Sequence, residues 1–209
     1  MFKRRYEISI LPTNINELSK RYVSDIVNNL VDERSNTLVL NQPFQGCNPI
    51  KSFKYFSNPS AIIVDRDPRD HYLFAKLFLQ PKGVGYLIPC ENVDDYIRYF
   101  LLIRQALPEI LARDDCLYIH FEKLIYDYEK AIKQISEFCG VKEHVLKGEH
   151  FKPTHSRNNT QLFNKYNGFE EDIEKIENEL TEYLFPFEDY PDIEAEGGMF
   201  YGNQSQKRK

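Results

Sequence analysis

The 209-residue chain has no apolar stretch near the roughly 20 residues that a membrane-spanning helix needs. Its basic N-terminus, MFKRRYEISILPTN, also lacks the apolar core of a signal peptide. Positive charge is not in excess either, because 32 Asp and Glu outnumber 27 Lys and Arg. We therefore expect a soluble, cytoplasmic protein without a membrane span or a nucleic acid partner, in which any anion site is local.

Cysteine and histidine are scarce. None of the four cysteines forms a C-x-x-C pair, and Cys116 and Cys139 lie within apolar runs, which favours free thiols in a reducing compartment. His144, His150 and His155 lack acidic partners at a metal-binding spacing. The sequence therefore predicts no metal site.

Apolar runs alternate with helical patterns along the chain. Short runs typical of buried parallel strands occupy residues 37–41, 61–66 and 116–121, and residues 6–11 alternate weakly. Helices are predicted at residues 14–31 with Asn14 as cap, 68–79, 92–113 with a bend at Pro108, 128–139 with Gly140 as cap, and 169–184. This order favours an α/β fold in one domain, residues 1–209, with an N-terminal helical segment (1–35), a core (36–185) and a loose polar tail (186–209).

The most specific feature is the charged sequence VDRDPRD between an apolar run and a helix. Asp67 at the N-cap, Pro68 at the first helical position and Asp70 in the first turn are explained by the start of a helix. Arg66 and Arg69 are not, because they add positive charge where the helix dipole is already positive. Two interpretations stay open: an anion held by arginine at the carboxyl edge of the strand, or a local Arg–Asp network at the surface.

An apolar strand followed by Arg-Asp-Pro-Arg-Asp and a helix resembles the motif with which sulfotransferases that use 3′-phosphoadenosine-5′-phosphosulfate (PAPS) hold the 3′-phosphate of the nucleotide. The resemblance places the first arginine of that motif at Arg66, with Arg69 beside it. The serine that shares this contact in the family is replaced by Phe74. The segment CLYIHFEKLIYDYEKAIKQISEFCGV resembles a later strand and helix of the family, with Phe121 and Glu122 at its Tyr-Glu positions.

The segment FKPTHSRNN lies where the family closes a late loop over the nucleotide, so the resemblance adds Ser156, Arg157 and Asn159 to the expected cofactor contacts. It covers about residues 37–166. It implies a P-loop-NTPase-like fold with a three-layer parallel sheet flanked by helices. It also implies PAPS or its product adenosine 3′,5′-bisphosphate (PAP) as ligand, and sulfuryl transfer to a hydroxyl or amine of a saccharide or small-molecule acceptor.

Two parts of the family pattern are missing. No glycine precedes Gly46, so the N-terminal phosphosulfate loop is not found, and the resemblance is to the C-terminal two thirds of the family without its first βα unit. The position of the family's catalytic histidine falls on Asn41, whose amide is a poor proton acceptor, so no catalytic residue is assigned.

These gaps leave two expectations. The chain is a sulfotransferase that is inactive as a truncated form, or it is a non-catalytic nucleotide-binding or interaction module of the same fold. In both cases the missing strand would leave an open sheet edge through which the protein could self-associate. A nucleotide kinase is disfavoured, because the sequence has no G-x-x-x-x-G-K-[ST] motif.

Overall fold

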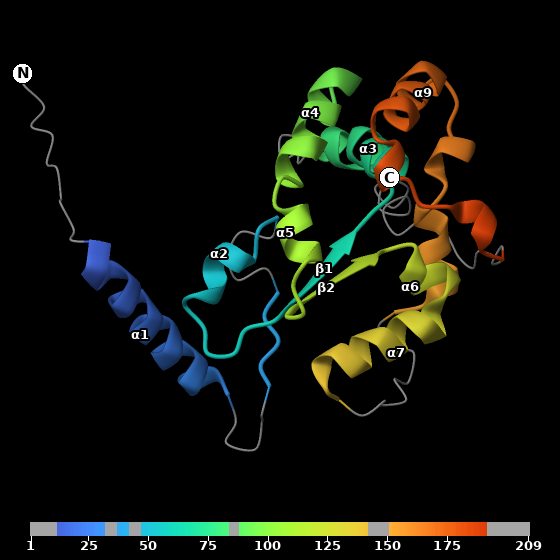
Figure 1. Ribbon diagram of the computed structural model, residues 1–209. Helices are drawn as coiled ribbons and strands as arrows, with labels where there is room; N and C mark the ends of the chain where they lie inside the picture. Colours follow the sequence, from blue (N-terminus) through green and yellow to red (C-terminus); the bar gives the residue numbers. More distant parts are fainter. Residues whose placement is uncertain (1–11, 32–36, 42–46, 84–87, 142–150, 192–209) are drawn as a thin grey trace, which may run out of the picture. The chain divides into compact units, whose positions relative to one another are not determined.

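The computed structural model of the chain describes residues 12–31, 37–41, 47–83, 88–141 and 151–191 (Figure 1). The expected strand at residues 6–11, the end of the tail, and the histidines at 144 and 150 lie outside these ranges. The chain divides into two compact units, Met1–Ala61 with Ala106–Cys116, and Ile62–Gln105 with Leu117–Lys209. The assignment of residues 1–209 to one sulfotransferase-like domain stays a prediction.

The first unit contains three helices in its described part: α1 (Pro12–Leu30), α2 (Ile50–Phe53) and α5 (Leu107–Leu111). The predicted N-terminal helix is present, but it begins two residues before Asn14, which is therefore not its cap. Its apolar stripe is exposed, with Leu18 and Tyr22 about two-thirds accessible. An amphipathic pattern thus predicted the helix without predicting what it packs against.

Residues 37–41 are an apolar run that does not form the predicted strand. They have no regular structure, and Val39 is 86% exposed. A short apolar run becomes a strand only where a neighbouring strand satisfies its backbone, and no such partner pairs with these residues in the described part of the chain.

Two strands, β1 (Ala61–Asp65) and β2 (Cys116–His120), form a parallel sheet (Figure 1). At its carboxyl end the amide of Phe121 donates to the carbonyl of Asp65 at 2.6 Å. The mixed α/β class is therefore confirmed, and both strands lie where the sequence predicted them. The described residues contain these two strands alone, so the three-layer sheet stays a prediction.

The helices of the second unit are, in its described part, α3 (Pro68–Phe74), α4 (Val93–Ile103), α6 (Lys123–Tyr126), α7 (Tyr128–Cys139), α8 (Pro153–Ser156) and α9 (Glu170–Glu179). A π-helical turn, Ala75–Leu79, extends α3 over the predicted length. The left-handed cap at Gly140 is confirmed, with φ of 62°. The long helix predicted to bend at Pro108 instead ends at Ile103, and Pro108 lies in the first turn of α5, a position that proline favours.

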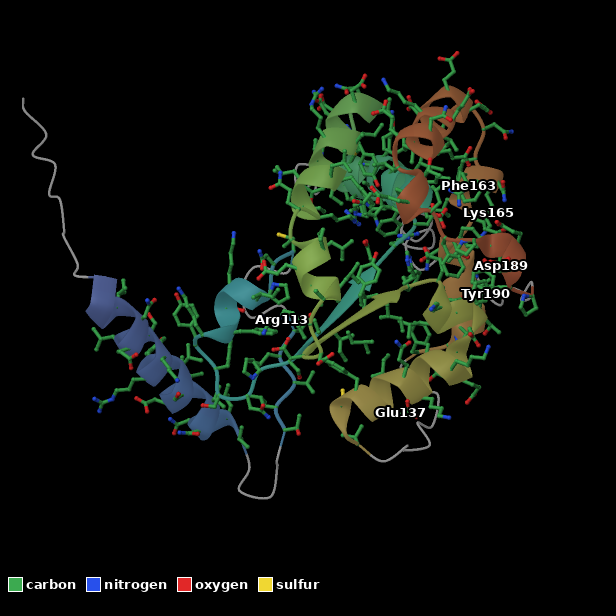
Figure 2. The ribbon with its side chains drawn as sticks, in the orientation of Figure 1. Arg113, Glu137, Phe163, Lys165, Asp189 and Tyr190 are labelled. Atoms are coloured by element: carbon green, nitrogen blue, oxygen red, sulfur yellow. The ribbon has the colours of Figure 1, made fainter. Side chains whose placement is uncertain are left out.

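The main core of the second unit lies between α3, α4 and α9, whose side chains fill the space between the ribbons (Figures 1 and 2). Its buried residues include Tyr72 and Leu73, Tyr96 and Phe100, and Ile176 and Leu180. A second cluster joins α6 to the segment after α9 through Ile125, Tyr126 and Phe185. The first cluster thus packs α3 against α4 and α9, and the second packs α6 against the segment after α9. Among the described residues, no helix is long and apolar enough to cross a membrane.

Candidate functional site

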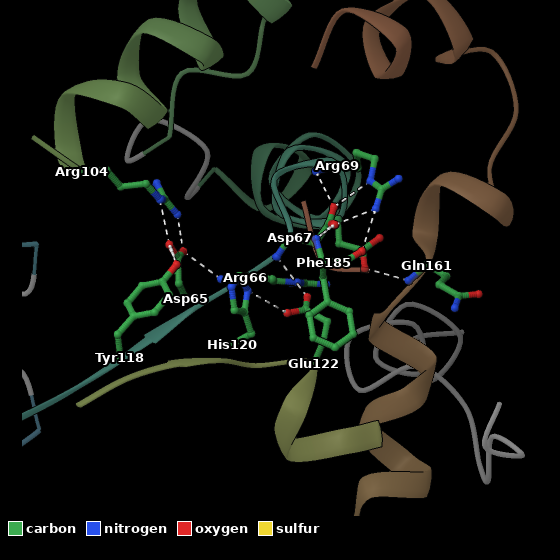
Figure 3. A network of polar contacts seen from close by, with 11 residues as sticks. Asp65, Arg66, Asp67, Arg69, Arg104, Tyr118, His120, Glu122, Gln161 and Phe185 are labelled. Atoms are coloured by element: carbon green, nitrogen blue, oxygen red, sulfur yellow. Dashed lines mark hydrogen bonds and ion pairs between the residues drawn. The ribbon is translucent and has the colours of Figure 1, made fainter. Parts of the chain in front are cut away.

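The candidate site is the joint between β1 and α3, at the carboxyl end of the sheet (Figure 3). β1 ends at Asp65, and Asp67 caps α3 by accepting a hydrogen bond at Oδ1 from the amide of Arg69 at 2.9 Å. Pro68 occupies the first helical turn, as the sequence predicted. The cap leaves Arg66 as the residue between strand and helix.

The side chain of Arg69 is buried and forms ion pairs with two carboxylates, Asp67 and Glu177. Its Nη2 donates to Asp67 Oδ2 at 2.7 Å and its Nη1 to Glu177 at 2.8 Å, while the guanidinium lies 4.0 Å from the ring centroid of Phe163. Burial opposes the charge of Arg69, but both carboxylates outweigh it and hold the pKa of the guanidinium above its ordinary value. Asp67 Oδ2 also accepts from the amide of Phe185 at 2.9 Å, so this network ties α3 to α9 and to the segment after it.

Asp65 forms a second buried network at the end of β1. Its carboxylate accepts hydrogen bonds from Arg104, with Nε at 2.8 Å, and from the Tyr118 hydroxyl at 2.8 Å. Burial alone would raise the pKa of Asp65, but the hydrogen bonds and charge of Arg104 hold that pKa below its ordinary value. Arg104 is thus paired, as Arg69 is.

Asp70 connects the joint to a segment about ninety residues later. Its fully buried carboxylate accepts from the amides of Gln161 at 2.7 Å and Leu162 at 2.6 Å, rather than from its own helix. Burial raises the pKa of Asp70 to about 6, while the charge of Arg66 opposes that rise. These bonds hold residues 157–162 beside the joint.

Arg66 differs from the paired arginines. Its Nη2 donates to the carbonyl of Asn159, and its guanidinium lies 4.9 Å from the ring centroid of Phe74 and 5.6 Å from that of Phe121. Its Nε is buried without a hydrogen-bond partner, and it forms no ion pair with a carboxylate of the described residues. Arg66 therefore carries a positive charge that the described part of the chain does not neutralise by direct pairing.

Glu122 and His120 bring two further unsatisfied atoms to the joint. Glu122 is fully buried; its Oε1 accepts from the amide of Asp67 at 3.0 Å, and its Oε2 has no partner. His120 Nδ1, also buried and unpartnered, lies 4.0 Å from that oxygen (Figure 3). Burial, and then the charge of Asp70, raises the pKa of Glu122 to about 8, whereas burial lowers the pKa of His120.

His71 presents a neutral imidazole in the first turn of α3. The Tyr96 hydroxyl donates to the carbonyl of Pro68 at 2.8 Å, so it accepts from His71 Nδ1, which lies 3.0 Å away. Burial, and then the charge of Arg104, lowers the pKa of His71 to about 4. Its Nε2 therefore carries a lone pair near neutral pH, and no residue of the described ranges hydrogen-bonds to it.

The structure brings some of the sequence-predicted residues together. Arg66 and Asn159 are in contact although 93 positions separate them, and Phe74 supports the guanidinium in place of a serine. Ser156 lies half-buried at the end of α8. Arg157 is buried over the Tyr126 ring, at 5.3 Å from the centroid, and donates to Thr160 and Gln161. Its side chain therefore contributes to packing beside the joint.

Asn41, at the position of the family's base, is exposed in the first unit, whereas the joint belongs to the second. Sequence reasoning missed Asp65, Arg104 and His120 as members of the joint. No local pattern could have found Arg104, because it pairs with Asp65 from 39 positions away.

Comparisons with known proteins add no assignment to this geometry. No group of three or more His, Cys, Asp or Glu side chains that could hold a metal occurs in the described ranges. No family model matches the chain, and neither a curated protein nor a solved structure shows significant similarity to it.

Proposed function

We propose that this protein is a sulfotransferase-like nucleotide-binding protein that holds the 3′-phosphate of PAP or PAPS at Arg66. The observation that carries the proposal is the guanidinium of Arg66, which forms no ion pair with the described carboxylates at the carboxyl end of a parallel strand. Ligands of α/β folds bind at that edge of the sheet. A charge left unpaired in a half-buried place is costly unless an anion binds there.

The surroundings of Arg66 suit a phosphate. Arginine is planar, permanently charged and able to bind two phosphate oxygens at once. The rings of Phe74 and Phe121 and the carbonyl of Asn159 restrain the plane of the guanidinium, and its Nη1 hydrogen-bonds to none of the described residues. Phe74 supplies no hydroxyl, so the phosphate contact would depend on Arg66 and on residues 156–159.

The proposal has a catalytic and a non-catalytic form. In the first, the protein transfers a sulfuryl group from PAPS to a hydroxyl or amine of a saccharide or small molecule. In the second, it binds the nucleotide without chemistry. The amide at Asn41 favours the second form, because the family's proton acceptor has no counterpart there.

Calorimetric titration with PAP tests the binding step. We expect Arg66→Ala to weaken PAP binding by on the order of 2–4 kcal/mol, or about 30-fold and more, because a charge-assisted bidentate contact is lost. Arg66→Lys should bind with intermediate affinity, since the charge remains and the fork geometry does not. Arg98→Ala is the matched control, because Arg98 is an exposed arginine on α4 whose ion pair is with Asp95.

The outcomes separate the interpretations. Equal PAP affinity in the wild type and Arg66→Ala would show that Arg66 does not hold the phosphate. Absence of PAP binding in the wild type would overturn the nucleotide-binding proposal altogether. If PAP binds, an assay with labelled PAPS and a panel of acceptors then distinguishes the enzyme from the non-catalytic module.

A further inference from the structure

The joint contains more carboxyl groups than cations that pair with them. Two of the four carboxyl groups form buried ion pairs: Asp65 with Arg104, and Asp67 with Arg69. The other two, Asp70 and Glu122, are fully buried and form no ion pair with a Lys or Arg of the described ranges. The charge of Arg66 acts on Asp70, where it opposes the rise of the pKa that burial causes.

Glu122 is linked to the Arg66 segment through neighbouring residues. Its Oε1 accepts from the amide of Asp67, which directly follows Arg66, and the ring of Phe121, which directly precedes Glu122, lies 5.6 Å from the guanidinium. Its Oε2 is buried without any donor, and the group opposite it is the neutral ring of His120 at 4.0 Å. An ionised Glu122 would thus accept one hydrogen bond and have no paired cation while fully buried, which is strongly unfavourable.

We propose that an anion binds at Arg66 only while Glu122 is uncharged, so that ligand binding is linked to the protonation of this buried carboxyl group. The inference rests on the proposed function, because it assumes a phosphate at Arg66. The physical reason is the local charge balance. With Glu122 neutral, Asp70 is the one fully buried carboxylate of the joint without an ion pair; with Glu122 ionised there are two, and both repel an anion that binds at Arg66.

The charged groups that act on Glu122 are Asp67 at the cap of α3 and Asp70 in its first turn, and the ring of His120 from β2 lies 4.0 Å from its Oε2. Lys123 of α6 acts in turn on His120. Burial raises the pKa of Glu122 to about 8, whereas that of Asp70 is raised to about 6 and that of His120 is lowered. The second ionisation of a phosphate monoester has a pKa of about 6. Above about pH 7, Glu122 is therefore the facing group whose charge changes, and the ligand is already fully ionised.

The test is the pH dependence of PAP binding between about pH 7 and about pH 9, measured by calorimetry in buffers of different ionisation enthalpy. We expect the affinity of the wild type to fall as the pH rises, approaching tenfold per pH unit above the pKa of Glu122, with uptake of about one proton on binding at the upper end. Glu122→Gln keeps the acceptor for the Asp67 amide and should bind with an affinity that does not vary with pH. Glu137→Gln, an exposed change on α7, should retain the wild-type profile.

Each possible result either supports the inference or overturns it. PAP binding by the wild type with a flat profile and no proton uptake overturns the inference and leaves the proposed function standing. The same slope in Glu122→Gln as in the wild type overturns the assignment to Glu122. Absence of PAP binding at every pH overturns the proposed function and this inference together. The proton count of the wild type carries the test even where Glu122→Gln fails to fold.

Discussion

Arg66 and Arg69 are three positions apart in the sequence, but their guanidinium groups contact different kinds of partner. Arg69 lies inside α3, where its guanidinium meets the cap residue Asp67 and Glu177 of α9. Arg66 precedes the cap and meets two aromatic rings and a carbonyl group. The two interpretations of the motif therefore divide between the residues. An Arg–Asp network describes Arg69, although it is buried and not at the surface as the sequence predicted, and Arg66 is the arginine to which the anion proposal applies.

Phe74 is a residue whose role a substitution can resolve. Its half-buried ring packs against the main core, 5.6 Å from the ring of Phe78, while Arg66 lies over it. We expect Phe74→Ser to lower the free energy of unfolding by about 2–3 kcal/mol, because apolar contacts are lost and a hydroxyl is placed among apolar groups. Phe74→Leu, measured by the same denaturant titration, should lose about 1 kcal/mol. Tighter PAP binding by Phe74→Ser without loss of stability would mean that this side chain faces the ligand.

At the scale of elements, Asp70 determines where residues 157–162 lie. Its two oxygens accept from two successive amides, of Gln161 and Leu162, while it is anchored in the first turn of α3. This bond pair places the carbonyl of Asn159 against Arg66. A carboxylate is required, because each amide needs an acceptor.

Asp70→Asn should therefore destabilise the protein by about 1–3 kcal/mol, since its amide nitrogen cannot accept from the second backbone amide and leaves it unsatisfied. Thermal unfolding measures this loss. Hydrogen exchange at residues 161 and 162 should rise by more than exchange in α4. Asp114→Asn, at an exposed aspartate, serves as the control, and equal stability of both variants would contradict the role of Asp70.

At the scale of the whole molecule, buried titratable groups make stability depend on pH. The pKa of Glu122 is raised to about 8 by burial, above its ordinary value of 4.5, so the folded state retains a proton that the unfolded chain releases. Stability is thus lost as the pH rises towards 8. The pKa of His71 is lowered to about 4 from 6.5, so its contribution is lost in the other direction, as the pH falls below 6.5.

Between about pH 6.5 and pH 8 the contribution of Glu122 is the largest, because Asp70 titrates near pH 6 and the opposing contributions of His71 and His120 are nearly complete within one pH unit above 6.5. We expect the free energy of unfolding of the wild type to fall by about 1 kcal/mol across it, because the slope of 1.36 kcal/mol per pH unit halves at the pKa of Glu122 and the two histidines oppose the fall. Denaturant titrations at several pH values measure this fall. The curve of Glu122→Gln should be flatter, and parallel curves would show that Glu122 is not the group responsible.

The sequence by itself determined the elements whose signals are local. β1, β2, the cap at Asp67 and the left-handed end of α7 at Gly140 follow from apolar runs and from capping chemistry within a few residues. The same local signals failed at residues 37–41, because a strand also needs a partner that the run does not encode.

Only the tertiary structure decided which charges at the joint are paired. Arg104 reaches Asp65 and the amides of Gln161 and Leu162 reach Asp70 across separations that no local pattern records. These long-range bonds neutralise or satisfy some groups and leave Arg66 and Glu122 uncompensated. The chemistry proposed for the site follows from that difference, because burial makes an unpaired charge costly and a ligand or a proton is what can balance it.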